Sequence, residues 1–227
     1  MCNLSAVPVL VEAAVEALEA ALAAAAGGAQ RIELCADLAH GGTTADAELL
    51  NASLSQLRIP VFVLVRPRPG DFVYSLAEHR TMLRQIDAAK AAGAAGIVTG
   101  ALTSHRSIDE GRLAELKAAA RPLPFTFHRA FDECPDLTMA LETLVRHGVD
   151  RVLTSGGAKT AALGAPQIAR LVKQARGRIG ILPGGGIDAS NVAGIVASGV
   201  SEVHFSVQTA QKVTEVLRAL TSADGKN

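Results

Sequence analysis

Gly28-Ala-Gln-Arg-Ile-Glu-Leu-Cys35 is the stretch that decides the fold, because its pattern recurs three more times along the chain. The other copies, which superpose on it without gaps, are Gly93-Ala-Ala-Gly-Ile-Val-Thr-Gly100, Gly148-Val-Asp-Arg-Val-Leu-Thr-Ser155 and Gly199-Val-Ser-Glu-Val-His-Phe-Ser206. Each glycine follows a helical stretch, where a helix C-cap needs a positive φ. The apolar run after each glycine predicts a short strand.

Further elements fill the spaces between the four copies. Strands are predicted at 9–15, 59–65, 123–127 and 179–182, and helices at 17–26, 45–57, 77–92, 110–119, 137–147, 165–175, 189–198 and 209–220. Eight alternations of strand and helix predict an α/β fold, a (β/α)8 TIM barrel whose parallel strands are joined by right-handed crossovers. A doubly wound open sheet is the alternative, but the regular repeat favours closure, because alternate barrel strands supply the same interior layers.

Composition predicts one domain over residues 1–227 that binds a small partner. Lys plus Arg equals Asp plus Glu at 22 each, and aromatic residues make up 3%, which argues against nucleic-acid binding. No apolar run approaches the ~20 residues that span a bilayer, so no membrane partner is expected. The three cysteines, Cys2, Cys35 and Cys134, form no CxxC pair, which predicts a reduced, cytoplasmic environment.

The barrel prediction places the functional site at the carboxyl ends of the strands. Strand periodicity puts two sets of repeat positions on one face, and the polar members of the first set indicate that this face points inward. The first set is Glu33, Val98, Leu153 and His204, and the second is Cys35, Gly100, Ser155 and Ser206. The second set is uniformly small, so we expect a cavity at the barrel mouth.

Charged residues lie at the ends of the odd-numbered strands. The clearest case is the stretch from Pro124 to Asp136, where an apolar run stops abruptly in ionisable residues. Together the strand ends supply Glu12, Arg66, Arg68, His128, Arg129 and Asp132. Ion pairs that hold the barrel ends together are the alternative explanation, but buried charges are rare unless they are paired or functional. We therefore predict Glu33, Arg66, His128, Arg129, Asp132 and His204 as catalytic residues.

A glycine-rich loop follows the seventh predicted strand. Barrels often bind phosphate with backbone N–H groups of the loops after strands seven and eight. We therefore predict an anion site formed by Arg68, Ser155, Gly156, Gly184, Gly185, Gly186 and Ser206. A tight turn that binds no ligand is the alternative.

Cys35 is the candidate metal ligand, because its thiol is soft and lies near Glu33, His128 and His204 in the predicted barrel. An inert buried thiol is the alternative, and no HxH, CxxC or HExxH spacing occurs. The remaining histidines are predicted to be loop or surface residues: His40, His79, His105 and His147.

Six motifs in this chain match one family in the same order. They are RIELCADLAHGGTT from Arg31, VRPRPGDFVYS from Val65, TFHRAFDECPD from Thr126, DRVLTSGG from Asp150, PGGGI from Pro183 and EVH from Glu202. On these motifs the chain resembles the CutC family, long called copper homeostasis proteins. The resemblance implies a cytoplasmic (β/α)8 barrel that forms a homo-oligomer and takes part in copper handling, with copper(I) as the metal implied and no securely identified enzymatic activity.

Two positions depart from the family pattern. The first strand of the family typically reads Glu-Val-Cys, whereas this chain has Glu12-Ala13-Ala14, and the segment after His204 is shorter. The leading hypothesis is a CutC-like barrel, associated with copper homeostasis, whose mouth binds a small anion. If it is an enzyme, its substrate is a phosphorylated or carboxylated metabolite, with His128 or Glu33 as general acid or base. A copper(I) carrier and a barrel that acts only through protein contacts are the alternatives.

Overall fold

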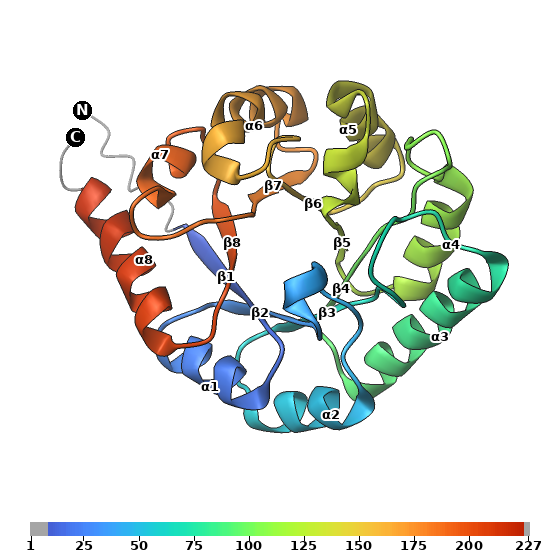
Figure 1. Cartoon of the computed structure of the whole chain (residues 1–227), viewed down its shortest axis with the longest axis horizontal. Coiled ribbons are helices and arrows are strands. Elements are labelled where there is room, and N and C mark those ends of the chain that lie inside the picture. The colour runs from blue at the N-terminus through green and yellow to red at the C-terminus, as the bar shows by residue number, and fades with distance from the viewer. Residues whose placement is uncertain (1–8, 225–227) are drawn as a thin grey trace.

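The computed structural model describes residues 9–224 and shows a ring of eight strands enclosed by helices (Figure 1). The strands are β1 (Leu10–Val15), β2 (Arg31–Leu34), β3 (Val61–Leu64), β4 (Gly96–Thr99), β5 (Phe125–Phe127), β6 (Arg151–Thr154), β7 (Gly180–Pro183) and β8 (Glu202–Ser206). The α-helices are α1 (Leu18–Ala26), α2 (Ala47–Gln56), α3 (Leu76–Ala92), α4 (Glu110–Ala120), α5 (Leu137–Arg146), α6 (Ala161–Ala175), α7 (Val192–Val196) and α8 (Ala210–Asp224).

The strands form one parallel sheet in the order β7-β6-β5-β4-β3-β2-β1-β8. An isolated parallel bridge between Gly184 and His204 brings the two edges together and nearly closes the barrel. This arrangement confirms the predicted TIM barrel and excludes the open sheet. None of the helices between residues 9 and 224 is long and apolar enough to cross a membrane.

Apolar residues pack on both faces of the strands. Outward residues such as Ile32 and Leu34 pack with the helices in the large core, whereas Cys35, Phe62, Leu64 and Val98 form a small cluster of their own. Glu33 lies between Ile32 and Leu34, so the strand alternation turns it toward the barrel interior with Cys35. The predicted inward face of the repeat is therefore confirmed for this strand.

The glycines that begin the four repeat copies adopt the predicted conformation. Gly28, Gly93, Gly148 and Gly199 have φ values of 100°, 97°, 64° and 90°. This left-handed region is open to glycine at little cost, and it ends each helix so that the chain can turn into the next strand. The repeat is thus a helix stop followed by a barrel strand.

Helix α6 begins at Ala161, four residues before the predicted start. The side chain of Thr160 accepts a hydrogen bond from Leu163 N and caps the first turn. A Cβ added to Gly164 would lie 1.8 Å from Ser155 O, so this turn packs directly on the loop after β6. Pro166 therefore lies within the helix rather than at its start.

Helix α7 spans only five residues, shorter than the predicted 189–198. Asp188 holds the preceding residues in a turn, because its carboxylate accepts from Ser190 N and its carbonyl from Asn191 N. These local bonds compete with helical hydrogen bonds, which shortens the helix. Two 3-10 turns were not predicted: η1 (Leu38–His40) lies over the centre of the ring in Figure 1, and η2 (Arg129–Glu133) follows β5.

Candidate functional site

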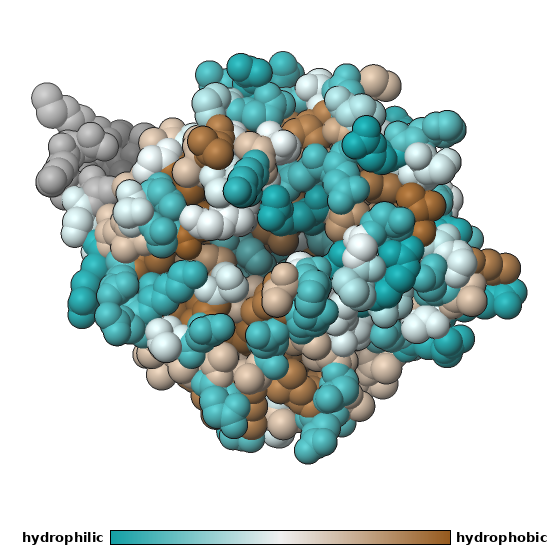
Figure 2. Space-filling view, in the orientation of Figure 1, coloured by the Kyte–Doolittle hydropathy of each residue, from teal (hydrophilic) through white to brown (hydrophobic). Residues whose placement is uncertain are grey.

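A cavity of about 200 Å³ lies at the barrel mouth. Its charged and imidazole-bearing lining residues are Glu33, Arg66, His128, Arg129, His204 and Lys212. Figure 2 shows the corresponding face with a hollow near its centre, bordered by hydrophilic residues and hydrophobic patches. The predicted cavity is therefore present. Five of the six predicted catalytic residues line it, and Asp132 is the exception. The loops after β3 and β7 also contribute to its wall.

A hydrogen-bonded acid and imidazole group forms one side of the cavity. His204 Nδ1 donates to Glu12 Oε1 over 2.7 Å, and the other carboxylate oxygen of Glu12 accepts from Arg31 Nε. Ligand atoms of Glu12, Glu33 and His204 lie within 4.8 Å of one another. Glu12 is buried beneath the cavity and is absent from its lining. Glu33 and His204 therefore face the cavity, whereas Glu12 lies below them and holds His204 in place.

The layer below contains a second charged group. Arg31 bridges the carboxylates of Glu12 and Glu202, and Arg151 Nε lies 3.0 Å from Glu202 Oε2. Both guanidinium groups lie over the ring of Phe62, at 5.0 and 5.3 Å from its centroid. This packing fills the barrel under the site and balances its buried charges, so that Glu12 stays ionised.

The pKa values of this group follow from burial and mutual charge. Burial alone would raise the pKa of Glu12, but the hydrogen bond and charge of His204, together with Arg31, lower it to about 2. Burial raises the pKa of Glu33 to about 7, helped by the charge of Glu12 and opposed by His204. Burial alone would lower the pKa of His204, but the charges of Glu33 and Glu12 raise it. Glu33 Oε2 has no hydrogen-bond partner among the described residues.

His128 stands across the cavity as a neutral imidazole. Its Nδ1 accepts a hydrogen bond from Ala130 N over 3.3 Å, which assigns the proton to Nε2. Burial lowers the pKa of His128 to about 3, and the charge of Arg66 acts in the same direction. A Cβ added to Gly100 would lie 3.0 Å from the imidazole ring, so the small residue predicted there makes room for His128.

Arg66 brings a buried positive charge to the mouth without an acidic partner among the described residues. Its Nη1 donates to His40 O and Gly42 O at 3.1 and 2.6 Å, and its Nη2 donates to Gly70 O at 2.8 Å. Its guanidinium lies 4.9 Å from the Phe72 ring centroid, and its Nε is unpartnered. Carbonyl oxygens offset the desolvation of Arg66 only in part, so a bound anion would be favoured here.

Asp132 organises the loop after β6 instead of facing the cavity. Its carboxylate accepts from Ser155 N at 2.9 Å and from Gly157 N at 3.0 Å, and it pairs with Arg129 Nε at 2.9 Å. Gly156 N donates to Thr154 Oγ1. The N–H groups of Ser155 and Gly156, predicted to bind an anion, are thus engaged within the protein.

The glycine loop after β7 is partly available to a ligand. Gly184 N donates to Thr154 O, whereas Gly185 and Gly186 line the cavity and have φ values of 102° and 71°. Their N–H groups have no protein acceptor in residues 9–224. Ser206 also lines the cavity, and its carbonyl accepts from Lys212 Nζ. This side of the mouth therefore retains the features of the predicted anion site.

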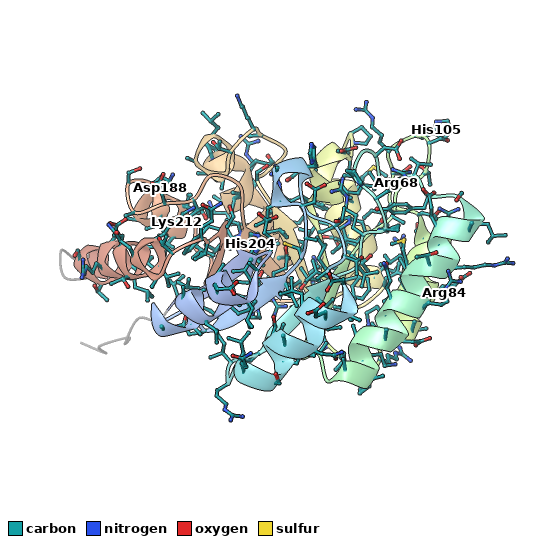
Figure 3. All side chains as sticks on the ribbon, turned by 60° about the horizontal axis from the view of Figure 1, so that its bottom comes forward. Arg68, Arg84, His105, Asp188, His204 and Lys212 are labelled. Atoms are coloured by element: carbon teal, nitrogen blue, oxygen red, sulfur yellow. The ribbon has the colours of Figure 1, made fainter. Side chains whose placement is uncertain are left out.

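Arg68, which was predicted to belong to the anion site, does not join Arg66 at the cavity. Strand β3 ends at Leu64, so strand periodicity no longer applies at these positions. Arg68 pairs with Asp71 and Glu78 at 2.9 and 2.5 Å and is absent from the cavity lining. Figure 3 shows it well separated from His204, whereas Lys212 lies beside Asp188 on the His204 side.

Cys35 belongs to the apolar cluster under the site. Its Sγ donates to Val15 O over 3.3 Å, and the residue is absent from the cavity lining. Burial and the charges of Glu33 and Glu16 raise its pKa far above the usual value. Burial likewise raises the pKa of Cys134, which lies in the large core, to about 11. Cys2 lies outside the described residues.

The donors at the mouth do not match copper(I). This soft ion prefers thiolate or thioether ligands, whereas the residues that approach one another here are two carboxylates and an imidazole. Cys35 offers one protonated thiol below them. In the described part of the chain, Ala14 lines the cavity where the family pattern has cysteine.

Sequence reasoning missed two features of the site, Phe72 and Lys212. Phe72 packs against Arg66 and lies 4.8 Å from the His128 ring, and Lys212 lines the cavity from α8. Phe72 lies in the motif that begins at Val65, but the direction of a loop side chain cannot be predicted from strand periodicity.

His79 was predicted at the surface and is instead 3% exposed, because its ring is packed under α4 with Nε2 2.8 Å from Glu115.

Comparison with known proteins gives concordant results. A model of the CutC family matches residues 9–209. A human protein named "Copper homeostasis protein cutC homolog" is 48% identical over 88% of this chain and 74% of its own length. A family protein CutC from Mesorhizobium japonicum is 47% identical over 87% of this chain and 77% of its own length. A crystal structure of a CutC protein from Streptococcus agalactiae, 34% identical, covers 87% of this chain and 98% of its own, with a TM-score of 0.82.

Proposed function

Because the chain belongs to the CutC family, we propose that it takes part in copper homeostasis and that its barrel mouth binds a small anionic molecule. The copper role rests on the names of its relatives. The anion site rests on one observation, the buried guanidinium of Arg66, which donates to three carbonyl oxygens, packs on the Phe72 ring and has no acidic partner among residues 9–224. Cytoplasmic location and homo-oligomeric assembly stay predictions.

The charge of the lining supports an anionic ligand. Arg66, Arg129 and Lys212 are its cations and Glu33 is its carboxylate, and Asp132 outside the lining pairs with Arg129. Arg66 and Lys212 form no ion pair with an acidic residue of the described chain within 4.0 Å. A phosphate or carboxylate between them and the N–H groups of Gly185 and Gly186 would gain charge-assisted hydrogen bonds.

Calorimetric titration with inorganic phosphate and with dihydroxyacetone phosphate tests the anion site. We expect Arg66→Gln to weaken binding roughly 10- to 100-fold, the equivalent of one charge-assisted hydrogen bond. Arg68→Gln is the matched control, because it removes the same charge from the rim and should leave binding unchanged. Lys212→Gln is a second test, because it removes a charge from the cavity and keeps the hydrogen bonds of Arg66 to the loops that contain Gly42 and Gly70. Equal binding by wild type, Arg66→Gln and Lys212→Gln would exclude this site.

The copper(I) carrier is a separate hypothesis with its own measurement. It requires a thiol-dependent stoichiometric site, so copper(I) titration of wild type against Cys35→Ala decides whether Cys35 takes part. Because the Cys35 thiol is buried and bonded to Val15 O, we expect both proteins to retain the same amount of copper. Loss of one equivalent in Cys35→Ala would support the carrier.

A further inference from the structure

Besides Arg66, two cavity-lining side chains each leave one buried polar atom unpartnered within residues 9–224. They are Glu33 Oε2 on the β2 side and His128 Nε2 just after β5. Strands β2 and β5 are separated by β3 and β4 in the sheet, so the two groups enter the cavity from different parts of the ring. Buried polar atoms normally have partners, and both atoms border the same cavity, which indicates groups that await a ligand.

His128 is suited to polarise a carbonyl group. The bond from Ala130 N to Nδ1 fixes the tautomer, so Nε2 carries the hydrogen. Arg66 and burial keep the ring neutral, and the contacts with Phe72 and Phe127 hold it in place. A neutral N–H donor can bind a developing oxyanion without first transferring its proton to bulk water.

Glu33 is suited to accept and return a proton. One of its oxygens is unpartnered, the residue is 5% exposed, and its pKa of about 7 keeps both protonation states accessible near neutral pH. His204, held by Glu12, lies beside it and stabilises its ionised form through charge. Glu33 and His128 thus supply a base and an electrophilic donor in one cavity.

Building on the proposed anion site, we propose that the ligand is a small carbonyl compound bearing a phosphate or carboxylate, and that Glu33 and His128 catalyse proton transfer next to its carbonyl group. The Glu33 carboxylate removes a proton from the adjacent carbon, and the C–H electron pair forms a carbon–carbon double bond. The carbonyl π electrons move to oxygen, which accepts a hydrogen bond from His128 Nε2. Return of the proton to the same carbon regenerates the compound. Where that carbon bears a hydroxyl group, the hydroxyl proton passes to the oxyanion, a new carbonyl group forms at that carbon, and return of the first proton to the former carbonyl carbon gives an isomer. No redox partner is required.

Hydrogen exchange detects this step without knowledge of the natural ligand. Dihydroxyacetone phosphate and pyruvate serve as probes in D2O at neutral pD, and proton NMR follows loss of the C–H signals beside the carbonyl. We expect the protein to accelerate exchange in at least one probe above the buffer rate. Glu33→Gln should slow this exchange roughly 100-fold or more, because an amide is no base at this pH, and His128→Phe should slow it by a comparable factor.

Controls separate this inference from the anion site on which it rests. His105→Gln changes an exposed loop outside the cavity and should exchange the probes at the wild-type rate. Circular dichroism checks that each variant is folded. If His128→Phe does not fold, His128→Asn is used in its place. A probe that binds in calorimetry without exchange overturns proton transfer and leaves the anion site standing. If none of the probes binds, both proposals are overturned. If Glu33→Gln exchanges the probes at the wild-type rate, the role of Glu33 is overturned.

Discussion

His204 of β8 donates its Nδ1 hydrogen to Glu12 of β1 over 2.7 Å, and the two residues are paired in the register of these strands. Because Arg31 holds the other carboxylate oxygen, Glu12 fixes the imidazole from below. A change at Glu12 should therefore alter both barrel stability and the cavity.

Glu12→Gln should destabilise the fold by on the order of 3 kcal/mol, because it leaves the buried charge of Arg31 without one of its two partners. Urea unfolding followed by circular dichroism measures the change. Glu142→Gln is the control, since Glu142 forms an exposed ion pair with Arg178, whose loss should matter little. Equal changes in unfolding free energy for the two substitutions would show that the buried ion pairs of Glu12 contribute no more to stability than an exposed pair.

His128 should make the protein less stable in acid. Its pKa is about 3 in the folded chain and 6.5 in the reference state, so between these values the unfolded chain binds one more proton. Stability from this residue is complete above pH 6.5 and falls as pH decreases toward 3, by about 1.4 kcal/mol per pH unit. Urea unfolding of wild type and His128→Phe from pH 7 to 4 should give a smaller pH slope for the variant. Parallel slopes would contradict a buried neutral imidazole.

Glu33 should act in the opposite sense. Its pKa is raised from 4.5 to about 7, so the folded chain binds the extra proton between these values. Stability is therefore highest below pH 4.5 with respect to this group and decreases as pH rises to 7. Glu33→Gln removes this penalty, so the variant should gain stability relative to wild type as pH increases over that range. The difference in urea midpoint between the two proteins, measured at pH 5 and pH 8, is the readout. A constant difference would contradict the assigned shift.

Gly164 should tolerate no side chain, because an added Cβ would lie 1.8 Å from the backbone oxygen of Ser155. Gly164→Ala should cost about 3 kcal/mol or more, since helix α6 must move away from the loop after β6. Gly194→Ala is the control within α7, where an added Cβ meets no atom within 4 Å, and it should be neutral or stabilising. Thermal unfolding of both variants tests this prediction: Gly164→Ala should melt at a lower temperature than Gly194→Ala. Similar melting temperatures for the two variants would contradict it.

The barrel and the polar face of β2 and β8 could be predicted because they lie within the repeat. One glycine and one strand period determine the direction of Glu33 and His204. The same rule failed at Arg68, since β3 had ended, and at Asp132, whose carboxylate turns back to the loop after β6 through η2. Loop directions depend on contacts between segments far apart in sequence, such as Arg66 with His40, which no local pattern contains.

The three carbonyl contacts of Arg66 join the loop that contains His40 and Gly42 to the loop that contains Gly70. Arg66 therefore supplies one of the positive charges of the mouth and also shapes its wall. Loss of Arg66 in evolution would remove the charge and release both loops in one step, so the two properties cannot drift separately. Relatives that bind a different ligand at this mouth should therefore retain Arg66 and vary at the opposite wall, around Gly186 and Lys212.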